Sequence, residues 1–421
     1  MDKLAIDGGT PVRTKPFPPW PIFGPEEADA LTDVLRGGAW GRLQGDRTAG
    51  FERRFAQFQG AAFALATVSG TAALRIALLA AGIEAGDEVI VPPYTFAATA
   101  SAVVEANALP VFADVEPDTY NLDPQAIEAA VTARTRAILP VHFGGLCCDM
   151  EAIAGVAARH GLTVIEDAAH AHGATWNGRG AGTLGAMGCF SFQSSKNLTC
   201  GEGGAITTDH EPLALACRQV HNCGRDPRGG AWYAHSSLGG NYRMTEFQAA
   251  VLNAQLDRLA EQTARRNENG RYLAGLLGDV PGVAPQGHRP YATRHGYHLF
   301  ILRYDEAAWG APRAAFVEGV RAEGIPLAAG YTLPLYRQPM FLQRRFGPYT
   351  GYRLARPDVD FAAFAGLCPV TERITRSEGC WLPQQVLLGE RQDMDDIAEA
   401  LAKVYRCRAA LRGRDTTKEP S

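Results

Sequence analysis

The chain has 421 residues, of which 46% are hydrophobic and 20% are charged, and its formal net charge is −4. This composition is typical of a globular protein with a sizeable core, and the length allows about two or three domains. It argues against a nucleic-acid or anionic-membrane partner, since both favour a strong basic excess. No apolar run reaches the roughly 18 residues that span a bilayer, and residues 1–20 contain no apolar signal core.

The nine cysteines are odd in number, scattered, and include no Cys-x-x-Cys pair. The sequence therefore predicts neither a disulfide framework nor a zinc site. Together with the missing signal core, this predicts reduced thiols and a cytoplasmic location. The histidines also lack carboxylate partners at metal-site spacing, so we expect no metal ion.

The first half of the chain alternates between short apolar runs and amphipathic stretches. Residues 1–25 are rich in proline and indicate an extended arm, and helices are predicted over 25–36 and 51–58. Strands are predicted over 63–68, 88–91, 110–115, 136–141, 162–167, 189–192 and 205–208, with helices over 71–81, 95–106, 124–131, 150–160 and 211–220. Strands separated by helices of this length predict a mostly parallel central sheet with helices on both faces.

The pattern changes in the last third of the chain. A long helix is predicted over 245–265, a strand over 297–304, and helices over 314–323 and 393–411. We therefore expect a large α/β domain over 1–265, which includes the N-terminal arm, and a smaller α+β domain over 266–421.

The stretch 188–204 carries the most informative residue, Lys196. It runs from a strand-like alternation through small polar residues to this lysine, and then through a glycine cluster to the next strand. A cation this close to packed strands is costly to bury, unless the amine is bonded to something. Schiff-base chemistry with pyridoxal phosphate (PLP) uses such a lysine. The alternative is a solvated surface lysine, although Lys196 is the only lysine inside the predicted α/β core.

A PLP site also needs an acid close to the pyridine nitrogen of the cofactor. Asp167 ends an apolar strand, and ligands of open α/β sheets bind beyond the carboxyl ends of strands. Its carboxylate would keep the pyridine nitrogen protonated, which makes the ring an electron sink. The alternative is an aspartate that caps a helix. His170 follows on the same turn, as either a cofactor contact or a core histidine.

Four further positions match the phosphate and the ring of such a cofactor. Gly70 and Thr71 lie where a strand enters a helix, and backbone N–H groups at a helix N-terminus bind phosphate. Ser191 could add a hydroxyl group, and Phe96 could provide a surface for the ring. Each has an ordinary alternative, because such turns, strand serines and core aromatics are common. No Gly-x-Gly-x-x-Gly motif follows the first strand, which argues against a dinucleotide-binding domain.

Together these motifs resemble the PLP-dependent sugar aminotransferases of the DegT/DnrJ/EryC1/StrS family, which have the type I fold. The matching stretches are 69–74, 93–99, 140–144, 165–170, 191–204 and 240–248. The resemblance implies that Lys196 holds the cofactor, Asp167 pairs with the pyridine nitrogen, His170 lies near the phenolic oxygen, Phe96 stacks on the ring, and Gly70, Thr71 and Ser191 hold the phosphate. It also implies an obligate homodimer, in which Asn241 reaches the phosphate of the neighbouring subunit.

The flanking segments narrow the expected substrate. Residues 4–13 and 368–389 resemble a subgroup that contains glutamine:scyllo-inosose and glutamine:2-deoxy-scyllo-inosose aminotransferases and 3-amino-5-hydroxybenzoate synthases. Nucleotide-sugar members often carry Tyr-x-Pro-Leu-His where this chain has 331–336, which ends in Tyr336. We therefore expect transamination of a keto-cyclitol with L-glutamine in aminocyclitol antibiotic biosynthesis. The alternatives are ring aromatisation of the aminohydroxybenzoate type and a nucleotide-linked keto-sugar substrate.

The residues that bind the substrate are less constrained by the sequence. Tyr336, Arg243 and Arg225 are the candidates for reading the donor carboxylate. A regulatory PLP-binding protein would need a DNA-binding appendage, and no basic helix-turn-helix segment is visible.

Overall fold

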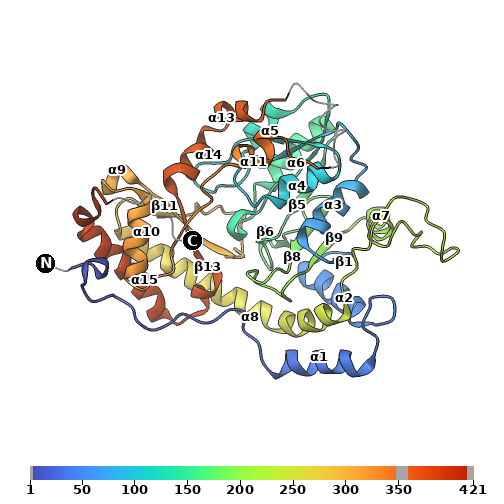
Figure 1. Cartoon of the computed structure of the whole chain (residues 1–421), viewed down its shortest axis with the longest axis horizontal. Coiled ribbons are helices and arrows are strands. Elements are labelled where there is room, and N and C mark those ends of the chain that lie inside the picture. Colours follow the sequence, from blue (N-terminus) through green and yellow to red (C-terminus); the bar gives the residue numbers. More distant parts are fainter. Residues whose placement is uncertain (1–2, 348–358, 415–421) are drawn as a thin grey trace.

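The computed structural model describes residues 3–347 and 359–414. The chain forms a large α/β unit and a smaller unit built on a second sheet, with the long helix α8 (Glu246–Leu276) running along both (Figure 1). None of the described helices is both long and apolar enough to cross a membrane.

A seven-stranded sheet forms the centre of the large unit, in the order β1-β9-β8-β5-β4-β2-β3. β9 alone runs antiparallel to its neighbours in this sheet. The strands are β1 (Phe63–Thr67), β2 (Glu88–Val91), β3 (Leu109–Phe112), β4 (Thr135–Ile138), β5 (Thr163–Asp167), β8 (Met187–Ser191) and β9 (Gly204–Thr208). The predicted mostly parallel sheet is thus confirmed.

Helices cover both faces of this sheet. They are α2 (Arg47–Gln59), α3 (Gly70–Ala80), α4 (Ala98–Glu105), α5 (Pro124–Ala130), α6 (Met150–His160) and α7 (Glu211–His221). Val89 and Val91 pack into one hydrophobic cluster with α3 and α4, whereas Ile90 packs into another with α5 and α6. Because both faces are covered, β2 is buried along its whole length, and its sequence is apolar almost throughout rather than alternating.

The smaller unit contains a four-stranded antiparallel sheet in the order β10-β11-β13-β12. Its strands are β10 (Val283–Pro285), β11 (Leu299–Tyr304), β12 (Ala328–Ala329) and β13 (Gly379–Pro383), and its main helices are α10 (Arg313–Ala322) and α15 (Arg391–Arg406). Phe300 and Leu302 of β11 face the core of this unit. Ile301 faces the other way and packs with Phe143 of the large unit. The alternation of β11 therefore joins the two units.

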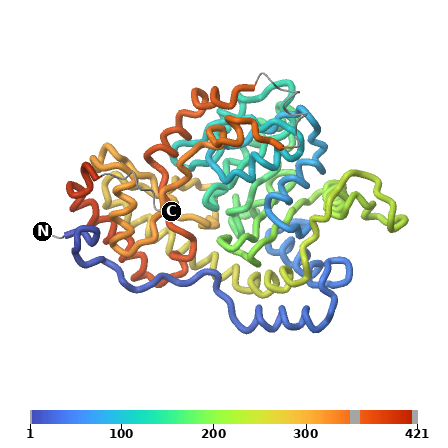
Figure 2. The backbone as a smooth tube through the Cα atoms, in the orientation of Figure 1, coloured from blue at the N-terminus to red at the C-terminus, as the bar shows by residue number. Residues whose placement is uncertain are grey.

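The N-terminal arm packs against the smaller unit before it reaches the large one. Leu4 is buried in the same cluster as α10 and α15, and Arg13 forms ion pairs of 2.8 Å with Asp393 and 2.7 Å with Asp396. Figure 2 shows the blue arm passing beneath the orange and red C-terminal helices on its way to α1 (Pro25–Gly37).

The helix predicted over 245–265 is longer in the structure and continues to Leu276 as α8. The first part of its extension, residues 266–271, is polar and shows no apolar periodicity. Asn269 is nevertheless buried and donates to the carbonyl oxygens of Leu387 and Gly389, at 2.9 Å each. α8 thus crosses the domain boundary predicted after residue 265, and that boundary stays a prediction.

Candidate active site

A cavity of about 540 Å³ lies at the carboxyl ends of β5 and β8, beside the N-terminus of α3. The smaller unit contributes to it through the start of β11, through β13, and through Tyr331. The lining includes seven of the residues predicted from the sequence, namely Gly70, Thr71, Phe96, Asp167, His170, Ser191 and Lys196. The structure therefore brings together a set that extends over more than 120 positions of the sequence.

Asp167 is the buried acid of this cavity, with 5% of its surface exposed. One carboxylate oxygen accepts a hydrogen bond of 2.8 Å from the hydroxyl of Thr99, and the other accepts one of 3.2 Å from the N–H of Ala169. Burial raises the pKa of Asp167, while the Thr99 hydroxyl, the Ala169 N–H and the charge of Lys196 act in the opposite direction. These bonds fix the carboxylate where a protonated ring nitrogen would be stabilised.

Lys196 lies on a tight turn after β8, where its N–H donates to the carbonyl oxygen of Gln193 at 2.8 Å. The arm supports this turn, since the indole of Trp20 donates to the carbonyl oxygen of Ser194 at 3.0 Å. Desolvation lowers the pKa of Lys196 to about 8, and the Asp167 carboxylate opposes the shift. Roughly one amine in ten is then neutral at pH 7, so the nitrogen is available as a nucleophile.

The turn before α3 forms an anion cradle. Ser69 caps the helix by accepting a hydrogen bond from Ala72 N, and the N–H groups of Gly70 and Thr71 belong to the first turn, where no partner exists within the helix. A Cβ on Gly70 would lie 2.8 Å from the Cβ of Ser191. Only a glycine therefore lets the serine hydroxyl approach the helix N-terminus, where the dipole also favours a phosphate.

Glycine at 204 has a related role at the back of this cradle. A Cβ there would lie 2.5 Å from the carbonyl oxygen of Ser69. The glycine cluster after Lys196 thus gives the α3 turn room to pack against β9.

Phe96 and His170 are the remaining predicted residues that line the cavity. Phe96 lines the cavity and is 61% exposed, so its ring is free to cover a planar ligand. His170 is buried, and its Nδ1 accepts a hydrogen bond of 3.3 Å from Gly144 N. Burial lowers the pKa of His170 well below its usual range, so the ring is neutral and Nε2 carries its proton.

The structure does not bring the other predicted residues to the cavity of this chain. Asn241 is exposed and forms a bridge with Asn222, whose side-chain oxygen accepts from Arg243 at 2.7 Å. Arg225 covers the ring of Trp232 at 4.3 Å. The predicted role of Asn241 at the phosphate of a neighbouring subunit, and those of Arg243 and Arg225 at the donor carboxylate, stay predictions.

Tyr336 differs from the expectation more clearly. It is completely buried, packs against Phe112, and donates its hydroxyl to Glu372 at 2.9 Å. The cavity is lined instead by Tyr331, at the other end of the same motif. The motif therefore supplies a tyrosine to the site, but from a different position.

The lining also includes residues that were not predicted, among them Thr99, His298, Tyr331 and Trp381. Thr99 follows Phe96 by three positions within the helix predicted over 95–106, so this spacing could have revealed it. The other three come from the smaller unit, and no local pattern indicates that its sheet faces Lys196.

These residues fit pyridoxal phosphate. The amine of Lys196, the acid Asp167, the N–H groups and hydroxyl around Gly70, and the exposed ring of Phe96 all border one cavity. The close approach of Gly70 to Ser191 provides the strongest test, because a side chain at position 70 would fill the cradle. The cofactor would thus be held at its aldehyde, its ring nitrogen and its phosphate.

Comparison with known proteins agrees with this assignment. The DegT/DnrJ/EryC1/StrS aminotransferase family matches residues 21–402. The L-glutamine:2-deoxy-scyllo-inosose aminotransferase of Streptomyces kanamyceticus is 42% identical over 429 residues, which cover 97% of this chain and 98% of that protein. The 3-amino-5-hydroxybenzoate synthase of Amycolatopsis mediterranei (strain S699) is 41% identical over 392 residues, which cover 92% of this chain and 96% of that protein.

A solved structure also matches almost the whole chain. The crystal structure of 3-amino-5-hydroxybenzoic acid (AHBA) synthase has a TM-score of 0.85 and 40% identity, and the match covers 94% of this chain and 100% of that chain. The type I fold predicted from the sequence is confirmed by this likeness. The chain belongs to the DegT/DnrJ/EryC1/StrS aminotransferase family and is a PLP-dependent aminotransferase.

Proposed function

We propose that the enzyme transfers the amino group of L-glutamine to a keto-cyclitol of the scyllo-inosose or 2-deoxy-scyllo-inosose type, in the biosynthesis of an aminocyclitol antibiotic. The similarity to the relative from Streptomyces kanamyceticus supports this substrate class. The chemistry of the cavity carries the proposal furthest. Lys196 is the only lysine or arginine among the described residues that line it. A nucleotide diphosphate would need several cations in addition to the one that reads the donor carboxylate, whereas an uncharged polyhydroxylated ring needs no further cation.

The residues of this chain divide the work of such a reaction. When bound, PLP supplies an electron sink that stabilises negative charge on the amino-acid α-carbon. Asp167 holds its negative charge beside the ring nitrogen, and Gly70, Thr71 and Ser191 hold the phosphate. Lys196 Nζ, with its pKa near 8, can take a proton from one carbon and return it to another near neutral pH. Both half-reactions can use the same lysine, as ping-pong kinetics requires.

The donor carboxylate needs a cation that the described lining of this chain does not provide, and we infer that a second subunit provides it. In the proposed homodimer, Asn241 reaches the phosphate of the neighbouring site, and Arg243 or Arg225 reads the donor carboxylate. The segment before Asn241 supports this arrangement, because it exposes Tyr233 and Leu238 to solvent at 85% and 90%. Large exposed apolar side chains that cluster in one loop are typical of interfaces.

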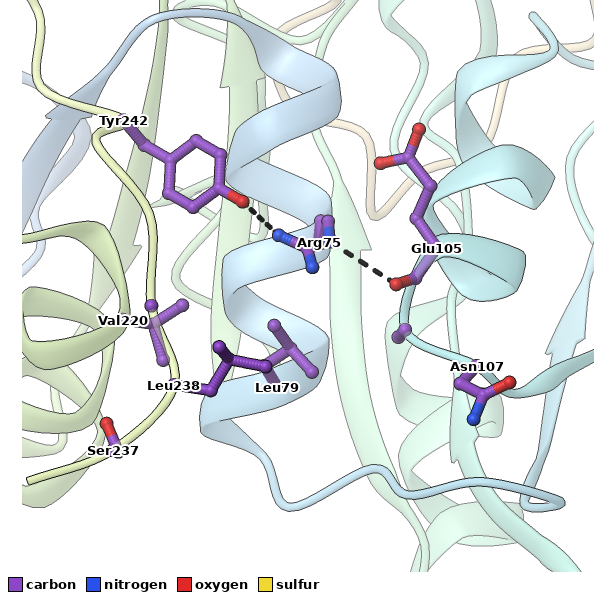
Figure 3. A pocket seen from close by; sticks show the side chains of 10 residues that line it. Arg75, Leu79, Glu105, Asn107, Val220, Ser237, Leu238 and Tyr242 are labelled. Carbon is purple, nitrogen blue, oxygen red and sulfur yellow. Dashed lines mark hydrogen bonds between the residues drawn. The ribbon is translucent and has the colours of Figure 1, made fainter. Parts of the chain in front are cut away.

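A second hollow supports the same interface. A cavity of about 510 Å³ lies between α3, α4 and this loop, and Leu79, Val220 and Leu238 line it (Figure 3). Arg75 spans the hollow, donating to the hydroxyl of Tyr242 and, at 3.3 Å, to the carbonyl oxygen of Glu105. Since α3 carries both this surface and the phosphate turn, a partner docked here would lie close to the cofactor. We also infer a cytoplasmic location, which nine cysteines without a disulfide bond among the described residues support.

Mixed dimers test the shared site. Lys196→Ala and Asn241→Ala are prepared separately, and both homodimers are expected to be inactive. After the two are mixed and subunits exchange, heterodimers contain one site with both residues intact, and about a quarter of wild-type activity returns. Mixtures that stay inactive although exchange is demonstrated would place Asn241 outside the neighbouring site.

The substrate is tested with the purified enzyme, PLP and L-glutamine. Scyllo-inosose and 2-deoxy-scyllo-inosose are offered separately, and mass spectrometry is expected to detect the amino-cyclitol. The ring precursor of 3-amino-5-hydroxybenzoate and a nucleotide-linked keto-sugar are assayed in the same way, as competitor substrates that represent the two alternative functions. Faster turnover of either competitor would overturn the proposed substrate class.

A further inference from the structure

A short chain of hydrogen bonds through Asn197 ends at His298 and fixes the tautomer of its imidazole. Asn197, the residue after the cofactor lysine, donates from Nδ2 to the carbonyl oxygen of Gly296 at 2.7 Å. Its amide oxygen therefore faces Nδ1 of His298, at 3.3 Å. An oxygen can only accept here, so Nδ1 of His298 carries the proton.

The backbone on which His298 lies is equally constrained. Gly296 N donates to the carbonyl oxygen of Gly145 at 2.8 Å, and a Cβ on Gly145 would lie 2.7 Å from Tyr297 N. The start of β11 thus packs tightly on the large unit. The imidazole ring of His298 cannot easily flip, because Asn197 and this backbone both hold it.

His170 has the opposite tautomer, and the two rings lie close together with their planes tilted by 38°. Gly144 N donates to Nδ1 of His170, which leaves the proton on Nε2, and the ring centroids of His170 and His298 are 4.3 Å apart. Burial and the charge of Lys196 lower the pKa of both histidines well below the usual range, so both are neutral. The site therefore contains one imidazole with a free N–H donor and one with a free nitrogen acceptor.

The acceptor belongs to the half of the cavity that the cofactor would leave for the substrate. His298 lines the cavity together with Leu299, Tyr331 and Trp381, all from the smaller unit. Among the residues that the structure describes, none bonds to Nε2 of His298. The indole of Trp381 can only donate, and the hydroxyl of Tyr331 can do either. His298 thus supplies an unprotonated ring nitrogen against an otherwise aromatic and aliphatic wall.

We propose that Nε2 of His298 accepts a hydrogen bond from a hydroxyl group of the keto ring, and that Asn197 positions the imidazole for this contact. The inference rests on the proposed function and deepens it, because it names a residue that selects polyhydroxylated ring ketones. A site built to accept from a substrate hydroxyl discriminates strongly against analogues without it, since its own polar group is then left unpaired.

The first test measures selectivity. His298→Phe keeps a flat ring and removes the acceptor. We expect kcat/KM for scyllo-inosose to fall about tenfold or more while kcat/KM for cyclohexanone, a ring ketone without hydroxyls, changes by less than about threefold. His298→Gln, whose side-chain oxygen can accept, is expected to restore most of the preference. If His298→Phe does not fold, the same comparison is made with His298→Gln against His298→Leu.

The second test distinguishes a contact with the amino donor from a contact with the ketone. The donor half-reaction is followed by the loss of the cofactor's yellow colour with L-glutamine alone, and we expect it to be unchanged in His298→Phe. A slower donor half-reaction with normal use of the ketone would mean that Nε2 contacts the amino donor, and would overturn the proposal. His172→Phe is the matched control, because His172 is equally buried, is neutral, and packs against Phe190 without lining the cavity.

The third test does not depend on turnover. Calorimetric titration with myo-inositol, a ring polyol without a ketone, is expected to show binding to wild type and to His172→Phe but at least about tenfold weaker binding to His298→Phe. Equal affinity in all three would overturn the role of His298 and leave the proposed function in place. A wild-type enzyme that aminates no keto-cyclitol would instead overturn the proposed function and this inference with it.

Discussion

Glu166 and Asp167 are adjacent in the chain, yet they point to opposite faces of the central sheet, and only Asp167 lines the cavity. Glu166 is completely buried and accepts hydrogen bonds from Gly182 N, Leu184 N, Gly185 N and His142 Nε2, at distances between 2.6 and 2.8 Å. It holds the loop before β8 in place. One carboxylate of the pair thus serves the structure and the other serves the chemistry.

This division predicts different effects for two isosteric substitutions. Asp167→Asn should lower kcat by about 10²–10³-fold, since it removes the negative charge beside the ring nitrogen, with little change in Tm. Glu166→Gln should lower the free energy of unfolding by about 2–4 kcal/mol, because four donors lose a charged acceptor, while folded molecules keep near-normal kcat. Denaturant titration and steady-state kinetics measure both. A large loss of kcat without loss of stability in Glu166→Gln would contradict the assignment.

The shifted pKa of Lys196 predicts how the cofactor-free enzyme reloads. Only the neutral amine attacks the aldehyde, so the rate of PLP incorporation should rise with pH and level off above about 8, the pKa of Lys196, rather than continue to rise toward the usual lysine range near 10.5. Stopped-flow absorbance follows the new bond. The Asp167 carboxylate raises this pKa, so Asp167→Asn should move the inflection to lower pH. A shift to higher pH would contradict the proposed coupling.

A single glycine controls the phosphate cradle, and Gly70→Ala should show this. Its Cβ would lie 2.8 Å from the Cβ of Ser191, so the serine or the turn must move. We expect the affinity of the cofactor-free enzyme for PLP to fall about tenfold or more, while its affinity for pyridoxal, which lacks the phosphate, changes little. Gly37→Ala at the end of α1 is the control, because nothing lies within 4 Å of a Cβ there. An equal loss for PLP and pyridoxal would indicate general damage to the site.

Residues that depend on a local motif were predictable, whereas those that depend on docking of the two units were not. Gly70, Asp167 and Lys196 each lie at a strand end or helix start that hydrophobic periodicity locates, and the carboxyl ends of neighbouring strands meet at one edge. His298 and Trp381 reach the cavity only because β11 and β13 pack against Phe143 of the large unit. No spacing in the sequence encodes that contact.

The second half of α8 shows the same limit in the fold itself. Its buried Arg266 donates to the side-chain oxygen of Gln384 at 2.8 Å, and its Asn267 donates to the carbonyl oxygen of His295 at 2.6 Å. These polar residues are stabilised inside the protein by partners from distant segments. Residues 266–271 contain no apolar side chain, and the prediction from periodicity therefore ends the helix too early.

The two tyrosines of the 331–336 segment allow a final test, because the sequence pointed to Tyr336 and the structure points to Tyr331. Tyr331 lines the cavity and packs edge-on against Trp381, with ring centroids 5.1 Å apart. Tyr331→Phe should raise KM for the keto-cyclitol by about three- to tenfold without a change in stability, since it removes one hydrogen-bonding group from the substrate half of the cavity.

Tyr336→Phe should have the converse effect. The hydroxyl of Tyr336 donates to Glu372, whose carboxylate also accepts from Arg337 at 2.7 Å, so its removal should lower the free energy of unfolding by about 1–2 kcal/mol. KM and kcat should stay within about twofold of wild type, because Tyr336 belongs to the large hydrophobic cluster and does not line the cavity. Steady-state kinetics and denaturant titration of both variants decide the matter. A raised KM in Tyr336→Phe with unchanged stability would restore Tyr336 as the substrate contact, since a purely structural tyrosine cannot produce that combination.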